Sequence, residues 1–347
     1  MASFASEESR SYHEQELIDY FIKEFMPPGA TSIPGNEWMT KVSSDMANTL
    51  LYANGRFQGL VPGLSPEDGY GGHPGLIYKL IVCALCFGIN KIGISVSKSV
   101  DNKKNPLTYE QKINLIDAII KELEKNVVNN ILASFLENEQ VKKILEQRLV
   151  ALRIHVEPLT NPFSMVLAFK KFFFNLHDVP KLIMATGLET KSDGTEYNKY
   201  AKTFDKLVGE QVLGEQEKPF SQVGFILTSR ETGDTMSGTI IRDLISSSNY
   251  AKLAEFIKNA DFTSEEFIQL YAQLIINVKR RTGHELSQGQ EGDTDEEILA
   301  KYAAILEENI AKVGEKRARL ESGGGSRTKK AKRTKKRKSK RRKSRRS

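Results

Sequence analysis

The chain has few cysteines, only two in 347 residues. This number cannot build the disulfide framework of a small secreted domain. Cys83 and Cys86 form a CxxC pair, but no second pair exists with which to hold zinc. Both thiols stand in an apolar run of helical period, so we expect small buried side chains rather than metal ligands or a redox pair.

Long apolar stretches are also missing. No run of about eighteen apolar residues occurs, so the sequence predicts no membrane-spanning helix and no membrane partner. Residues 1–10 are polar and acidic and do not have the basic-then-apolar order of a signal peptide. We therefore expect an intracellular protein.

Acidic residues are absent from residues 327–346, which contain 15 Lys or Arg. The rest of the chain has 36 basic and 44 acidic residues, a net charge of −8, although the whole chain carries +7. A segment so charged and so poor in apolar residues is expected to be disordered and to bind nucleic acid through counterion release. A nuclear-localisation signal is the competing interpretation, and one segment can serve both roles; the expected location is accordingly the nucleus, the cytoplasm or a nucleic-acid-rich particle.

Short apolar runs alternate with segments of helical period, which predicts an α/β protein. We expect a Rossmann-like, doubly wound, five-stranded parallel sheet with additional C-terminal helices and a disordered basic tail. Ligands should gather at the carboxyl ends of the strands. The predicted strands are residues 49–53, 91–96, 149–156, 181–185 and 222–227, and the predicted crossover helices are residues 73–87, 108–125, 162–176 and 195–208.

Composition divides the chain into four parts. They are an N-terminal extension (1–45, with an amphipathic stretch at 16–25), the α/β domain (46–248, with a helical insertion at about 127–147), C-terminal helices (249–321) and the tail (322–347). Helices are expected at about residues 239–246, 250–258, 264–281 and 295–320, and a flexible hinge at 322–326.

Glycines and an imidazole surround the first predicted strand and helix. Gly55, Arg56 and Phe57 follow the strand, and Gly72 and His73 open the helix. Glycine lets the backbone approach a phosphate, and a helix start offers unpaired N–H groups. An imidazole there can donate to phosphate oxygens in a transition state, although a capping histidine would fit the same pattern.

A second anion-binding helix start follows the last predicted strand, where residues 237–242 are Ser-Gly-Thr-Ile-Ile-Arg. Ser237 is a natural N-cap. The hydroxyls of Ser237 and Thr239 and the guanidinium of Arg242, one turn on, can donate to an anion. Alone, the segment is typical of a plain capping motif.

Together these segments resemble the nucleotidyltransferase superfamily that includes nicotinamide-mononucleotide adenylyltransferases, cytidylyltransferases and pantetheine-phosphate adenylyltransferases. Residues 55–58 (Gly-Arg-Phe-Gln) match the family's first-strand segment, residues 72–73 match the end of its HxGH motif, and residues 237–242 match its ISSTxxR-like motif. Residues 104–112 are similar to the Asn-Pro-Phe-Thr segment of the archaeal-type adenylyltransferases. The resemblance covers roughly residues 49–246.

The resemblance implies an enzyme that transfers a nucleotidyl group from ATP or CTP to a small phosphorylated acceptor, such as nicotinamide mononucleotide, and releases pyrophosphate. It makes His73 and Arg242 catalytic, and Mg²⁺ is expected with the triphosphate, held mainly by phosphate oxygens and water. Thr186 and Gly187 stand where the family loop contacts the base or ribose, and a plain strand-to-helix turn is the alternative there. The implied nucleotide-binding residues are Gly55, Arg56, Phe57, Tyr70, Gly72, His73, Thr186, Gly187, Ser237, Gly238, Thr239 and Arg242.

The sequence departs from the family at Tyr70, which stands at the first His of HxGH, and in a longer loop at residues 59–69. Tyrosine donates a hydrogen bond but cannot carry positive charge. The departure favours an alternative function, a nucleotidyltransferase-fold protein with a weakened site that its tail attaches to DNA or RNA.

Overall fold

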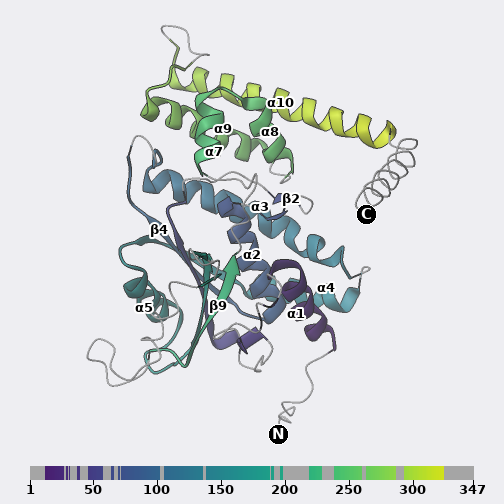
Figure 1. The fold of residues 1–347 in the computed structure, drawn as a ribbon, viewed down its shortest axis with the longest axis vertical. Helices are drawn as coiled ribbons and strands as arrows, with labels where there is room; N and C mark the ends of the chain where they lie inside the picture. The colour runs from purple at the N-terminus through teal and green to yellow at the C-terminus, as the bar shows by residue number, and fades with distance from the viewer. Residues whose placement is uncertain are drawn as a thin grey trace, which may run out of the picture.

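The computed structural model describes most of the chain between residues 12 and 323 (Figure 1). The described residues are 12–26, 29, 31, 37–39, 46–57, 64–65, 69–70, 72–101, 105–135, 138–187, 189–190, 196–197, 219–228, 238–259, 263–286 and 293–323. Ser237 and the basic segment 327–346 lie outside them.

A five-stranded parallel sheet forms the centre of the protein and confirms the α/β prediction. Its order, β5-β4-β1-β6-β9, is 3-2-1-4-5 when these strands are numbered along the chain, which is consistent with a Rossmann-like sheet. The strands are β1 (Thr49–Gly55), β4 (Lys91–Ser97), β5 (Arg153–Leu159), β6 (Lys181–Gly187) and β9 (Gln222–Thr228).

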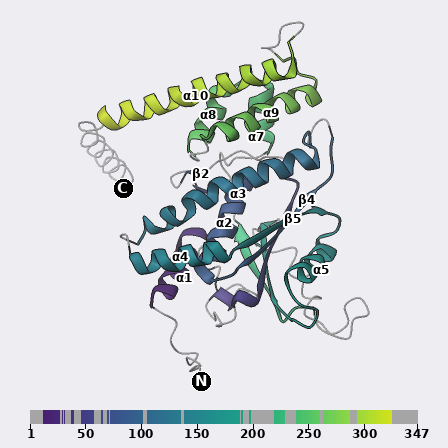
Figure 2. The same cartoon turned by 180° about the vertical axis from the view of Figure 1, so that it is seen from behind.

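Helices cover both faces of the sheet (Figures 1 and 2). On one face lie α2 (Gly72–Phe87) and α3 (Tyr109–Leu132), and on the other lies α5 (Pro162–Phe173). The ring of Tyr52 in β1 lies 5.9 Å from that of Phe169 in α5. Gly93 in β4 has to be glycine because a Cβ atom there would lie 2.8 Å from the same ring. The close approach of α5 to the sheet therefore depends on a missing side chain.

Several predicted boundaries were wrong. Residues 149–151 end helix α4 (Glu139–Ala151) rather than begin a strand, since one apolar run contains both the helix end and β5. The predicted insertion at 127–147 is the second half of α3 followed by α4, whose first turn Asn138 caps. Helix α5 ends at Phe173 instead of residue 176 because the Asp178 carboxylate accepts the Asn175 N–H and forms a turn.

The prediction of a helix at residues 195–208 was wrong at residues 196–197, which are the part of it that the structure describes. Glu196–Tyr197 form strand β8, which pairs antiparallel with β7 (Glu189–Thr190). Ladder hydrogen bonds and the strand preference of tyrosine outweigh the helical periodicity there. Residues 198–208 lie outside the described residues.

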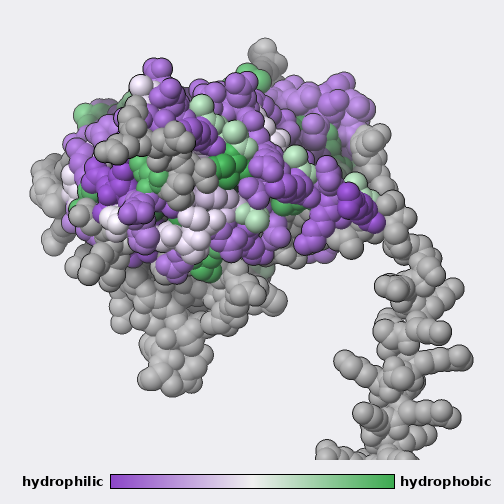
Figure 3. Space-filling view, turned by 90° about the horizontal axis from the view of Figure 1, so that it is seen from above, coloured by the Kyte–Doolittle hydropathy of each residue, from purple (hydrophilic) through white to green (hydrophobic). Residues whose placement is uncertain are grey.

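Four helices follow β9 and form a layer above α3 (Figure 1). Helix α10 packs along α8 and α9 through Ile298, Tyr302, Leu306 and Ile310, which are buried at four-residue spacing. It continues to Gly323, so the hinge predicted from residue 322 begins inside this helix. The visible outer face of the layer is mostly hydrophilic (Figure 3). The helices are α7 (Gly238–Ser246), α8 (Tyr250–Asn259), α9 (Glu265–Thr282) and α10 (Asp295–Gly323).

The amphipathic N-terminal stretch is helix α1 (Tyr12–Phe25), which packs on α2. The ring of Phe21 meets that of Phe87 edge-on at 5.6 Å. The buried amine of Lys79 in α2 donates to the Phe25 carbonyl at the end of α1. Short 3₁₀ helices at Glu37–Met39 and Met46–Asn48 and the hairpin of β2 (Leu64–Ser65) and β3 (Gly69–Tyr70) complete the described elements.

Cys83 and Cys86 are fully buried in α2, as predicted. Burial raises the pKa of both thiols, that of Cys86 beyond any physiological pH. Within the part of the chain that the structure describes, no helix combines the length and apolar character needed to cross a membrane.

Burial lowers the pKa of Lys79 to about 8, from an ordinary value of 10.5. Between pH 8 and 10.5 the unfolded chain holds this proton and the folded chain releases it, so the free energy of unfolding should rise with pH by about 1–3 kcal/mol. Below pH 8 both states are protonated and this rise is absent. Urea unfolding at pH 7 and pH 10 should give a pH-dependent change that is more positive in the wild type than in Lys79→Met by this amount, because the other buried groups that titrate in this range are the same in both proteins.

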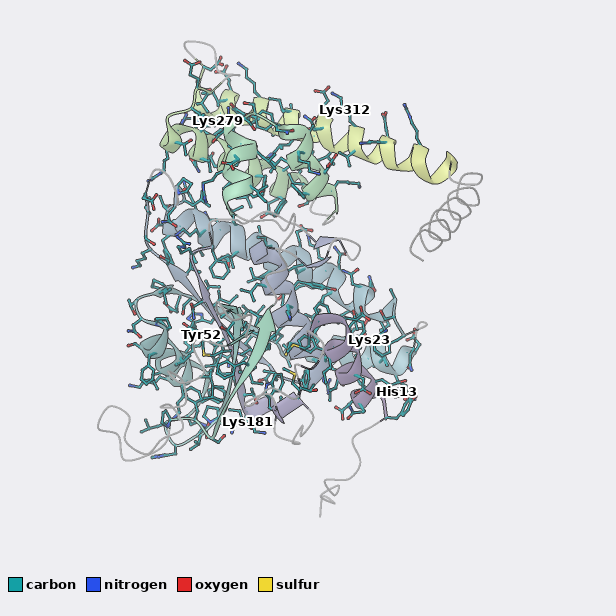
Figure 4. The ribbon with its side chains drawn as sticks, in the orientation of Figure 1. His13, Lys23, Tyr52, Lys181, Lys279 and Lys312 are labelled. Carbon is teal, nitrogen blue, oxygen red and sulfur yellow. The ribbon has the colours of Figure 1, made fainter. Side chains whose placement is uncertain are left out.

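The matched control is Lys23→Met, which removes an exposed lysine from α1 (Figure 4). This variant should keep the wild-type difference between the two pH values, because an exposed amine keeps the same hydration in both states. If the free energy of unfolding depends on pH equally in the wild type and in Lys79→Met, the lowered pKa of Lys79 is contradicted.

Candidate functional site

The carboxyl ends of all five strands meet at one edge of the sheet, because the strands are parallel. Gly55 ends β1, Ser97 ends β4 and Gly187 ends β6. The strand order reverses between β1 and β6, and ligands of open parallel sheets bind outside such a point. This carboxyl edge of the sheet is the candidate site.

The turn after β1 is strained and anchored. Phe57 has φ = 47°, in the left-handed region that bulky side chains rarely adopt. Its side chain is fully buried, so core packing holds a conformation that costs about 1–3 kcal/mol. Arg56, one residue earlier, stays exposed. The turn therefore presents the Arg56 guanidinium at the carboxyl edge.

Arg242 comes to the same edge from α7. Ile241 and Ile245 are buried and fix the helix against α8 and α9. Arg242 itself is half-buried, and this burial lowers the pKa of its guanidinium. The neighbouring charge of Asp243 raises that pKa, the charge of Arg56 lowers it and that of Asp101 raises it. Since such effects fade with distance, Arg56 and Asp101, far from Arg242 in sequence, are close enough for their charges to act on its guanidinium.

A buried lysine holds the loop that follows β4. Lys112, in the first turn of α3, donates to the carbonyls of Ser97 at 2.6 Å and Ser99 at 3.3 Å. Burial lowers the pKa of this amine to about 8. The Asp101 N–H donates to the Asn105 carbonyl at 2.8 Å, and the Asn105 amide donates to the Asp101 carboxylate. These contacts fix the Asp101 carboxylate, whose charge acts on the Arg242 guanidinium.

A row of polar side chains crosses the sheet near the same edge. Asn54 in β1 pairs with Ser95 in β4, and Ser95 pairs with Glu157 in β5. Side chains alternate along each strand, so these residues share the face that carries α5. Thr186, two residues beyond the Tyr52–Met184 pair, continues the row on β6 and is buried.

The remaining predicted residues lie on two helix starts and a hairpin. Gly72 and His73 are the first residues of α2, and Gly238 and Thr239 are the first residues of α7, as the sequence predicted. Tyr70 ends β3 and pairs with Leu64 ahead of α2. The side chains at positions 70, 73 and 239 and the whole of residue 237 lie outside the described part of the structure.

Sequence reasoning missed Asp101 and the role of Lys112. A signal for Lys112 exists, because it occupies the apolar phase of α3, one turn before the buried Leu115 and Ile116. A lysine at such a position needs carbonyl partners. No comparable signal marks Asp101, whose role depends on its distance from residues on other elements.

The chain matches no protein-family model, no curated protein and no solved structure. Its chemistry is therefore best argued from the carboxyl edge. There, the charges of Arg56 and Asp101, from two other segments, act on the Arg242 guanidinium.

Proposed function

We propose that the protein binds the triphosphate of ATP or CTP at the carboxyl edge and transfers the nucleotidyl group to a small phosphorylated acceptor. The observation that carries the proposal is the mutual approach of Arg56 and Arg242. Two like charges that fold together repel each other, and a polyanion between them removes the repulsion. Phosphate oxygens also match the fork of a guanidinium, which donates two parallel hydrogen bonds.

The two helix starts support the same ligand. Helix α2 begins just after the strained turn at Phe57 and the β2–β3 hairpin, and α7 begins after β9. Unpaired N–H groups and the positive end of the helix dipole favour an anion at each start. A triphosphate presents three linked phosphate groups and can therefore engage several such donors along its length.

In the proposed reaction, an oxygen of the acceptor phosphate attacks the α-phosphorus, and the bond to the β-phosphate oxygen breaks as pyrophosphate leaves. His73 donates to the α- and β-phosphates, and Arg242, with Ser237 and Thr239, holds the β/γ side. Arg56 holds phosphate near β1. No covalent intermediate forms on the protein, so positioning and charge stabilisation provide nearly all of the rate.

Asp101 is the described side chain that best fits the expected Mg²⁺. Its carboxylate offers the hard oxygen ligand that this ion prefers, and it lies beside the guanidiniums that would hold the triphosphate. When bound, the ion would neutralise phosphate charge.

The direct test is acceptor-dependent release of pyrophosphate. The full-length chain is incubated with Mg²⁺, with ATP or CTP labelled at the γ-phosphate, and with phosphorylated acceptors including nicotinamide mononucleotide. The proposal expects labelled pyrophosphate, rather than orthophosphate, only when the right acceptor is present. Absence of pyrophosphate with every acceptor, together with absence of triphosphate binding, would remove the proposal.

The composition of residues 327–346 favours a second candidate function, attachment to nucleic acid. Deletion of residues 327–347 should abolish binding to duplex DNA and RNA at moderate salt. The wild type should lose affinity steeply with salt, because each neutralised phosphate contributes about −0.9 to the slope of log K against log salt. Filter binding at several salt concentrations measures both slopes.

The control for the deletion is triphosphate binding, which should be unchanged because the carboxyl edge lies within residues 49–246. Nucleic-acid binding that survives the deletion with the same salt slope would contradict the assignment to the tail.

A further inference from the structure

Strand β5 lies at one edge of the sheet. Among the strands that the structure describes, β5 pairs only with β4 and forms one edge of the sheet. The Arg153 N–H donates to the Asn90 carbonyl at 2.9 Å, so the backbone groups of Arg153 face β4. Backbone groups alternate along a strand, and those of Ile154 and Val156 therefore point away from β4. Pro158, the next residue of this outward series, has no N–H to offer.

The side chains on the α5 face of this strand have a symmetric order of charge. Arg153, His155 and Glu157 alternate onto this face, with a cation and an anion two residues on either side of the imidazole. The His155 ring stacks on Phe172 at 3.9 Å, and its Nε2 atom lies 2.9 Å from a Glu157 carboxylate oxygen. The Arg153 guanidinium lies 5.5 Å from the ring centre of Phe173. These contacts hold the three polar side chains along the strand.

Exposed apolar side chains flank the strand on both faces. Phe172 in α5 is 51% exposed although it stacks on His155. Val150, near the end of α4 and just before β5, is 89% exposed. Helix α4 packs with α2 and α3, and α5 covers the other face, so the helices that carry these two residues lie on opposite faces of the sheet (Figure 2). An edge strand between exposed apolar groups is a typical pairing surface.

We propose that two copies of this chain associate by antiparallel pairing of their β5 strands about a twofold axis at His155. In this register Ile154 of each copy faces Val156 of the other, and each such pair exchanges two hydrogen bonds. Arg153 of each copy faces Glu157 of the other, so two ion pairs form across the axis. The two sheets become one continuous sheet.

Pro158 and the charged side chains together favour this register over the two neighbouring ones. An axis at Val156 would place Pro158 opposite Ile154 and leave the Ile154 carbonyl without a donor. An axis at Ile154 would place Arg153 opposite His155 and remove the ion pairs. Only the axis at His155 satisfies the outward backbone groups of both Ile154 and Val156 and also matches the charges.

The charge order also identifies the occupant as a second copy. A strand with a cation and an anion at equal distances from its centre is complementary to itself when it is reversed. A different partner would need to present the same reversed order. Isologous pairing meets this requirement without further assumptions, because both surfaces come from one sequence.

Charge reversal tests the pairing. The full-length wild type should sediment at twice its monomer mass of 39.0 kDa. Arg153→Glu and Glu157→Arg should each halve that mass, since each variant places like charges opposite one another. The double variant Arg153→Glu/Glu157→Arg should restore the dimer. Lys143→Glu, which reverses an exposed charge on α4, should remain dimeric.

A cysteine pair tests the register independently of charge. His155→Cys should cross-link two copies under a mild oxidant, because the axis brings the two positions opposite each other, whereas Arg153→Cys should not. The native cysteines are buried, so the wild type should not cross-link. A wild type that stays at 39.0 kDa at every concentration, or a dimer that neither single reversal dissociates, would overturn the proposal.

Discussion

Replacing His73 by alanine should lower the kcat of pyrophosphate release by about 100- to 1000-fold, the usual effect of removing one donor that stabilises transition-state charge. The triphosphate Kd should change much less, because this donor acts mainly on charge that develops during transfer. His73 is the second residue of α2, so its backbone already lies at a helix start suited to a phosphate. Single-turnover kinetics with the identified acceptor separates the two quantities.

The matched control for this variant is His177→Ala, which removes an exposed imidazole from the loop after α5. Its kcat should equal that of the wild type. Tyr70→His provides a second, opposite test, because a cationic donor at this position should raise kcat. An unchanged kcat in His73→Ala would remove this residue from the chemistry.

Replacing both Arg56 and Arg242 by alanine should weaken triphosphate binding by at least about a hundredfold. Each guanidinium makes charged hydrogen bonds, which contribute about 1.5–3 kcal/mol apiece. The single alanine variants should each lose about ten- to a hundredfold in triphosphate affinity. Arg242→Lys should lose less than Arg242→Ala, because lysine keeps the charge but not the fork of the guanidinium. Calorimetric titration with a non-hydrolysable triphosphate measures the affinity of the wild type and of each of the four variants.

The affinities of the wild type, the two single alanine variants and the double variant form a double-mutant cycle. In the ligand-free wild type the two guanidiniums repel each other, and removal of either one removes this repulsion. The losses of binding free energy in the two single variants should therefore not add up to the loss in the double variant. Arg319→Ala, which changes an exposed ion pair near the end of α10, is the control and should bind as the wild type does. Wild-type affinity in the double variant would contradict the proposed site.

The sheet was predictable because its strands are short apolar runs separated by segments of helical period. β1, β4, β6 and β9 begin at the predicted residues and run one or two residues longer. β5 was misplaced because the apolar run 149–156 continues from the end of α4 into the strand. Periodicity cannot separate two apolar elements that follow one another, whereas the extended backbone of Leu152 at the end of α4 and the ladder with β4 do.

The candidate site was predictable only where it depends on local chemistry. Glycine and a hydroxyl or imidazole at a helix start are local signals, and α2 and α7 do begin at Gly72 and Gly238. The left-handed backbone of Phe57 and the position of Asp101 depend on packing between distant segments. No window of sequence contains that information.

The far end of α10 fixes the point from which the basic segment starts. Contacts with α8 extend to Gly314, and the remaining helical residues project by about 14 Å beyond the layer (Figure 1). Residues 327–346 therefore follow a rigid spacer whose base rests on the same layer as α7. A nucleic acid held by these residues would be tethered beyond the end of α10, so the protein could stay attached to it without using the carboxyl edge for that contact.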